Sequence, residues 1–169
     1  MSYEINKITY PSVTQITGQL DKSDALIPWA IKSCCEYIHR NYDDNTNIDN
    51  LLKKAKKEYR EISKKAKDIG TQVHDMIECY IKKQKIDDTN ITNEAHNGFK
   101  AFLKWEQKNV KKWLESEIPI VHEKICYAGT MDAVAILNDN KKYCIDFKSS
   151  KGFYDGYDLQ VAAYKYARE

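Results

Sequence analysis

Two extended runs in the last third of the chain constrain its fold most strongly. The first, TMDAVAIL at 130–137, is apolar on both sides of a strand except for Asp132, and such a strand is typical of the centre of a sheet. The second run, KKYCIDFKS at 141–149, follows after the turn residues at 138–140. We therefore predict a tight antiparallel hairpin whose first strand lies inside the sheet.

This hairpin would gather charged side chains on one face. Asp146 and Lys148 are two residues apart, so on a strand they share a face. A loop at 138–140 would set Asp132 opposite Asp146, and a loop at 139–141 would set it opposite Lys148. In either register the three side chains crowd together, and the two carboxylates repel each other.

A divalent cation would relieve this repulsion. The alternative is a solvated hairpin face, but Val134, Ile136 and Cys144 surround the charges and make that face less polar. Mg²⁺ takes oxygen ligands and is commonly held by one or two carboxylates together with substrate phosphate. An adjacent lysine would orient a metal-activated water or stabilise the transition state. Two aspartates and a lysine around Mg²⁺ or Mn²⁺ therefore predict a phosphodiesterase site.

Most of the chain before the hairpin has a helical pattern. Ser12 begins a capping box that Gln15 closes, and Gly18 ends this short helix, which lies within 10–18. Three longer helices are predicted: one that begins at Pro28 and runs through WAIKSCCEYIHR, one over 49–84 that Gly70 interrupts, and one over 93–114.

The hydrophobic period changes after residue 114. A first strand lies within 116–129, the hairpin follows, and a last helix covers 156–169. Helices, then three strands, then a helix predict a mixed α/β (α+β) protein. We expect one domain over 1–169, with an N-terminal helical part at 1–48 and a core at 49–169.

Composition limits the classes of protein to consider. Of 169 residues, 42% are hydrophobic and 31% are charged, which is typical of soluble globular proteins. There is no apolar run of about 20 residues and no signal peptide, so we expect no membrane association. Five cysteines without a C-x-x-C pair argue against a disulfide framework and favour a reducing, cytoplasmic setting.

Net charge alone does not indicate nucleic-acid binding, because it is only +2. Any affinity for a polyanion would depend on local charge. The stretch 53–67 holds eight Lys or Arg against two Glu; it is either a solvated helix face or a surface along phosphates. Tyr154 and Tyr157 could stack on an unpaired base or pack at the edge of the core.

Several motifs together resemble a known superfamily. GTMDAVAIL, YCIDFKSSK and LQVAAYKYA occur in the order seen in PD-(D/E)XK nucleases, and GTQVHDMIE resembles the G-T-x-x-H-x-x-I-E helix of the RecB-like exonucleases. These exonucleases occur in recombination machinery, phages and CRISPR spacer acquisition. Asp132 matches the G-x-x-D aspartate, and Asp146 with Lys148 match (D/E)-x-K. The Q-x-x-x-Y helix matches at Gln160 and Tyr164.

The resemblance implies a restriction-endonuclease-like core, with a mixed central sheet flanked by helices. It implies a metal-dependent DNA nuclease, an exonuclease of recombination, repair or phage DNA processing, with DNA and a helicase or recombination protein as partners. Its implied ligands of Mg²⁺ or Mn²⁺ are His74, Asp132, Asp146 and the main-chain carbonyl of Phe147. Lys148 would assist the attacking water, and Gln160 and Tyr164 would hold the substrate strand.

Two acidic residues have supporting roles in this expectation. Glu78 follows His74 by one turn, as a further ligand, an acceptor that orients His74, or a solvated side chain. Glu117 is preferred over Glu123 as the acidic residue of the first strand.

The chain departs from the family pattern in two places. Some RecB-like exonucleases hold an iron–sulfur cluster with one upstream cysteine and three near the C-terminus. Here Cys34 and Cys35 lie upstream, but no cysteine follows Cys144, so a complete cluster is not expected. The superfamily core continues with a strand after the Q-x-x-x-Y helix, whereas this sequence ends at Glu169. Two alternatives follow: the sequence is truncated, or the sheet is completed in another way. The alternatives are a non-catalytic module of the same fold that binds DNA or a helicase, and an RNA-processing nuclease.

Overall fold

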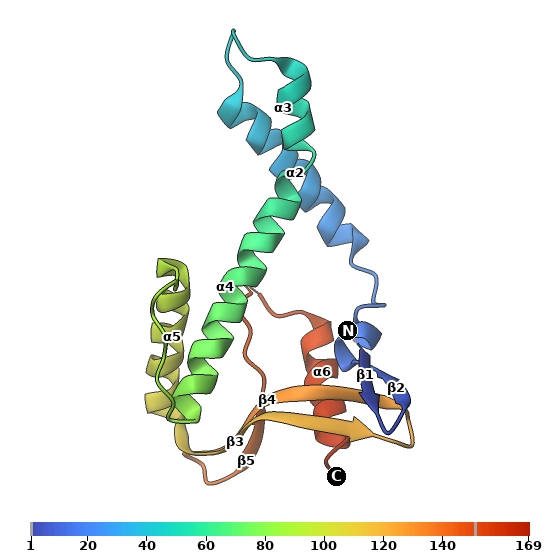
Figure 1. Cartoon of the computed structure of the whole chain (residues 1–169), viewed down its shortest axis with the longest axis vertical. Coiled ribbons are helices and arrows are strands. Elements are labelled where there is room, and N and C mark those ends of the chain that lie inside the picture. Colours follow the sequence, from blue (N-terminus) through green and yellow to red (C-terminus); the bar gives the residue numbers. More distant parts are fainter. Residues whose placement is uncertain (1, 151) are drawn as a thin grey trace. The chain divides into compact units, whose positions relative to one another are not determined.

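The computed structural model describes residues 2–150 and 152–169 (Figure 1). The chain forms two compact units: the N-terminal segment to Leu20 together with Ile69–Glu169, and Asp21–Asp68. Neither boundary coincides with the predicted division between residues 48 and 49. That the whole chain is a single domain stays a prediction.

The smaller unit is helical. It holds α2 (Ser23–Asn41), α3 (Ile48–Ala55) and the beginning of α4 (Glu58–Ile81). The predicted start of the second helix at Pro28 is wrong, because α2 begins at Ser23. Asp21 accepts the main-chain N–H of Ser23 at 2.8 Å, which satisfies a free donor and lets the helix begin earlier.

The predicted helix over 49–84 is two helices, and its break is not at Gly70. The break lies between α3 and α4, at Lys56 and Lys57, and α4 continues through Gly70. A Cβ atom at Gly70 would lie 2.8 Å from Oγ of Ser149. This glycine therefore permits a close approach between α4 and the segment around Ser149, whereas its helix-breaking tendency is overridden.

The larger unit contains a three-stranded sheet in the order β3–β4–β5. The strands are β3 (Val110–His122), β4 (Tyr127–Leu137) and β5 (Lys142–Ile145). The prediction that 130–137 forms the central strand is confirmed. Both strand pairs of this sheet are antiparallel, and an isolated parallel bridge joins Ser12 to Ala128 of β4. The mixed central sheet expected for the core stays a prediction.

The turn between β4 and β5 selects one of the two predicted registers. Leu137 donates its N–H to the carbonyl of Lys141 at 3.1 Å, and Ala133 pairs with Ile145. The loop is therefore 138–140, which points Asp132 towards Asp146. The predicted strand over 141–149 is too long, because β5 ends at Ile145, so Asp146 and Lys148 lie beyond the ladder.

Two other predicted boundaries need correction. The helix expected over 93–114 is α5 (Asn93–Asn109), and β3 begins at Val110. The ladder shifts register between Val110 and Lys112 and again between Trp113 and Glu115. These irregularities hide the alternation typical of a strand, so Trp113 also fits the helical pattern.

The N-terminal segment forms a hairpin that the pattern analysis missed. β1 (Ser2–Ile5) pairs with β2 (Ile8–Pro11) across Asn6 and Lys7, whose φ angles are 52° and 64°. Two adjacent positive φ angles are typical of the tightest hairpin turns. The expected capping box of α1 (Val13–Thr17) is confirmed, with Ser12 and Gln15 bonded in both directions at 3.0 Å.

Two hydrophobic clusters fill the larger unit. In the α6 cluster, α6 (Asp155–Tyr166) and α1 pack against the sheet, and its buried residues are Val13, Ile120, Tyr127, Met131, Val134 and Tyr164. In the α4–α5 cluster, α5 lies alongside α4 (Figure 1). Its buried residues are Val73, Ile77, Ala95 and Phe102, with Trp113 and Phe147 among those packed against them. No helix of the described residues is long and apolar enough to cross a membrane.

Candidate active site

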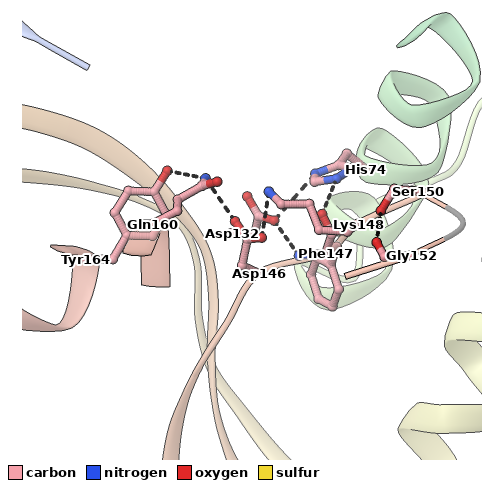
Figure 2. Close-up of polar contacts among 9 residues, drawn as sticks. All are labelled: His74, Asp132, Asp146, Phe147, Lys148, Ser150, Gly152, Gln160 and Tyr164. Carbon is pink, nitrogen blue, oxygen red and sulfur yellow. Dashed lines mark hydrogen bonds and ion pairs between the residues drawn. The ribbon is translucent and has the colours of Figure 1, made fainter. Parts of the chain in front are cut away.

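His74 and Asp132 meet at the main chain of Phe147. The ring Nε2–H of His74 donates to the Phe147 carbonyl at 2.9 Å, and the Phe147 N–H donates to Oδ2 of Asp132 at 2.7 Å. Nδ1 of His74 lies 3.6 Å from the same carboxylate oxygen. A helix, a strand and the segment after β5 therefore converge on one point (Figure 2).

Asp146 joins this point to α6. One of its oxygens lies 2.6 Å from Nζ of Lys148, and the other accepts Nε2–H of Gln160 at 3.1 Å. The Asp146 side chain is only 3% exposed, whereas that of Lys148 is 28% exposed. The Asp146 carboxylate is thus buried, whereas solvent can reach the Lys148 ammonium. Figure 2 shows the ammonium directed back towards the two aspartates.

The two residues of the Q-x-x-x-Y motif form a chain of hydrogen bonds that ends at Asp146. Gln160 also lies 2.7 Å from the hydroxyl of Tyr164, and both side chains are buried. Burial raises the pKa of Tyr164 to about 12, so its hydroxyl stays protonated at neutral pH. A Cβ atom at Gly129 would lie 2.7 Å from the Tyr164 ring, so this glycine is what lets the tyrosine approach β4. The contacts predicted between this pair and a substrate strand stay a prediction.

Lys148 has a second neighbour, Tyr157, which the sequence suggested either for base stacking or for packing at the edge of the core. Its Nζ lies 5.1 Å from the ring centre of Tyr157, a favourable cation–π distance. Tyr157 also packs edge to face against Tyr154 at 5.5 Å. The only available signal was a tyrosine at the beginning of the final helix, nine residues after the lysine.

Glu117 lies close to Asp132. It stands between the strand pairs Ser116–Ala133 and Ile118–Met131, which is the position facing Asp132, and its φ is 51°. Such a φ is rare for a residue other than glycine and often marks a functional site. Burial raises the pKa of Glu117, and the negative charges of Asp132 and Glu78 raise it further. Glu123, the less favoured candidate, lies exposed in the turn after β3.

Glu78, for which three roles were left open, has an acid–base neighbour on its own helix. It forms an ion pair with Lys82 in the next turn of α4, while the His74 Nε2–H is bound by the Phe147 carbonyl. The negative charge of Glu78 also raises the pKa of Glu117, so Glu78 acts electrostatically on the site. A role in orienting His74 stays a prediction.

Ionisation of the Asp132 carboxylate is disfavoured in the folded protein. Burial raises its pKa, and so does the charge of Asp146, against the opposing effects of His74, the Phe147 N–H and Lys148. Negative charge is therefore crowded at this site. A cation placed between the carboxylates would offset part of that cost.

The donor chemistry of the site suits a hard divalent cation. Asp132, Asp146 and the Phe147 carbonyl offer oxygen, and His74 offers a ring nitrogen. Among residues 2–150 and 152–169, no three His, Cys, Asp or Glu side chains converge closely enough to form a ligand group by themselves. The residues fit the cation by donor type and charge, with the carbonyl of Phe147 as the additional oxygen.

Known proteins give no family for this chain. Neither a protein-family model nor, at a significant level, a curated protein matches it. The resemblance to PD-(D/E)XK nucleases therefore stays a prediction that depends on the motif residues themselves.

Replacing Asp132 with asparagine is expected to stabilise the metal-free protein. The raised pKa means that the native state holds this proton more tightly than the unfolded chain, so stability is lost as pH rises through the folded pKa. Asp132→Asn removes that loss at neutral pH. The free energy of unfolding should rise by about 1 kcal/mol, and Tm by about 2–4 °C. Thermal melting in a chelator at pH 7.5 measures the effect.

A matched control is Asp139→Asn in the hairpin loop. Hydrogen bonds from the Lys141 N–H and the Tyr143 hydroxyl lower the pKa of Asp139, so its charge favours the native state and no gain is expected. Equal melting temperatures for Asp132→Asn and the wild type would contradict the idea that ionising the buried Asp132 carboxylate costs stability.

Proposed function

We propose that this chain is a metal-dependent deoxyribonuclease with a PD-(D/E)XK core, and that it acts as an exonuclease. The observation that carries the proposal is the meeting of Asp132, Asp146 and Lys148. Nζ of Lys148 lies 2.6 Å from Asp146, and the N–H of Phe147, between these two residues, binds Asp132 at 2.7 Å. The aspartate of GTMD and both charged residues of IDFK therefore contribute to one small site.

Each residue has a distinct task in this proposal. His74, Asp132, Asp146 and the Phe147 carbonyl would hold Mg²⁺ or Mn²⁺. When bound, the ion would lower the pKa of a water molecule and neutralise charge on the phosphate.

Lys148 would act on the reacting groups themselves. Its ammonium is fixed between the Asp146 carboxylate and the Tyr157 ring, and it remains partly open to solvent. A preorganised positive charge at this place can orient the attacking water and stabilise the extra negative charge of the transition state. Because the lysine is held on two sides, little reorganisation is needed when the phosphate arrives.

Gln160 and Tyr164 would keep Asp146 in place. Gln160 donates to Asp146 and also contacts the Tyr164 hydroxyl, so the carboxylate has a second partner besides Lys148. This arrangement adds a positioning role to the substrate contact expected for the pair. We further propose that the protein acts on DNA in the cytoplasm, together with a helicase or recombination partner.

One assay tests the proposal directly. End-labelled DNA, linear or circular and single- or double-stranded, is incubated with purified protein in Mg²⁺, Mn²⁺ or a chelator. We expect loss of label from linear DNA with either metal, no cleavage with chelator, and resistance of circles. An RNA of the same sequence serves as the comparison substrate.

Two results would contradict the proposal. Absence of metal-dependent cleavage of every DNA form, together with Mn²⁺ binding that does not depend on Asp132 or Asp146, would favour a non-catalytic module. Cleavage of the RNA alone would move the activity to RNA processing.

A further inference from the structure

A cavity lies directly beside the polar residues of the site. Its volume is about 400 Å³, and its walls come from α4, α5 and the segment after Asp146. His74, Phe147 and Lys148 line the cavity and also belong to the candidate active site. The cavity and the candidate active site therefore share these three residues.

The cavity has an apolar floor and a more polar rim. Ile77 and Phe102 are buried beneath it, while Trp105 is 38% exposed at its edge. Ser149 and Ser150 are exposed and add hydroxyl groups beside Lys148. An apolar pocket with a few polar groups at one side is the usual form of a site for a flat organic ligand.

We propose that this cavity receives an unpaired nucleobase of the DNA strand whose phosphate lies at Lys148. The inference rests on the proposed nuclease function and deepens it. Aromatic walls favour stacking with a base of any sequence. Because a paired base inside a duplex cannot enter a pocket, the substrate class is single-stranded DNA or a frayed strand end.

Charge decides which part of a nucleotide occupies the cavity. Lys148 stands at one end of the cavity, whereas the buried side chains of Ile77 and Phe102 form its floor, where a phosphate group would lose its hydration without gaining a partner. A base presents a ring face, which suits the apolar and aromatic walls. The ammonium of Lys148 at the shared boundary suits the phosphate that joins this nucleotide to the next.

The exposed residue Ala101 gives a way to fill the cavity without cutting into the core. Ala101 lines the cavity, whereas Gln107 lies exposed on the same helix and does not line it. Ala101→Phe and Gln107→Phe therefore add the same side chain inside and outside the pocket. Trp105→Ala provides a second variant that removes a wall instead of filling the space.

Binding is measured in chelator, by fluorescence anisotropy of a labelled single-stranded oligonucleotide and of its duplex. We expect Ala101→Phe and Trp105→Ala to weaken single-strand binding by about 10-fold or more. Gln107→Phe should bind as the wild type does, and duplex binding should be weaker than single-strand binding and unaffected by the variants. Quenching of tryptophan fluorescence by the oligonucleotide should largely disappear in Trp105→Phe.

The outcomes separate this inference from the nuclease. Single-strand binding by folded Ala101→Phe and Trp105→Ala that equals that of the wild type would overturn the base pocket, even if metal-dependent cleavage continues. If Ala101→Phe and Trp105→Ala lose single-strand binding while the wild-type protein cuts no DNA, the base pocket would be supported and the nuclease function overturned. Tighter, Ala101-dependent binding of the matching RNA would overturn the assignment to DNA.

Discussion

Lys148→Met is expected to lower the rate of metal-dependent DNA hydrolysis by about 10²–10³-fold, the usual effect of removing one preorganised charge from a transition state. Methionine keeps much of the lysine's length and apolar stem, so the loss should come from the charge. The rate is measured under single-turnover conditions with end-labelled linear DNA, which separates chemistry from product release.

Lys142→Met is the matched control, since Lys142 is exposed on β5 of the same hairpin. It should cleave DNA at the wild-type rate. Asp146→Ala should also abolish metal-dependent cleavage, because it removes both a proposed metal ligand and the partner of Lys148. Wild-type cleavage by either Lys148→Met or Asp146→Ala would exclude the proposed chemistry.

Phe102→Ala is expected to destabilise the fold by about 3–5 kcal/mol, the range for truncating a buried phenylalanine. The Phe102 ring is 7% exposed and packs against four other rings, those of Tyr80, Phe99, Trp113 and Phe147. Removing it leaves a cavity in the α4–α5 cluster that rigid neighbours cannot fill. Urea denaturation followed by circular dichroism gives the free energy of unfolding.

Phe153→Ala makes the same chemical change at a residue that is 98% exposed. Because almost no surface is buried there, its free energy of unfolding should equal that of the wild type. Phe102→Leu should lose less stability than Phe102→Ala. A cost for Phe102→Ala no larger than that of Phe153→Ala would show that the aromatic contacts do not hold this part of the fold.

Local patterns predicted those features that depend on neighbouring residues. The alternation of apolar residues identified β4, the residues Asn138 to Asn140 identified the turn, and Ser12 with Gln15 identified the cap of α1. Each of these signals operates over a few residues, where side-chain period and main-chain hydrogen bonding follow directly from residue type.

Features that depend on distant contacts were not predictable in this way. The end of β5 at Ile145 follows from the binding of the next residues to α4, β4 and α6. The unusual φ of Glu117 and the cavity beside Lys148 likewise result from packing between elements. Residue identity suggested which side chains belong to the site, whereas tertiary contacts determine how they meet.

The main chain of Phe147 is fixed on two sides and its ring on a third. Its N–H is bound by Asp132, its carbonyl is bound by His74, and its ring packs into the α4–α5 cluster. The two charged residues on either side of it, Asp146 and Lys148, lie beyond the end of β5. Their spacing depends on Phe147 as well as on the contacts of Asp146 with Gln160 and of Lys148 with Tyr157. In the proposed nuclease, the rate of cleavage would therefore depend on how closely the α4–α5 cluster packs around the Phe147 ring, and a substitution in that cluster can alter the rate without removing a polar group.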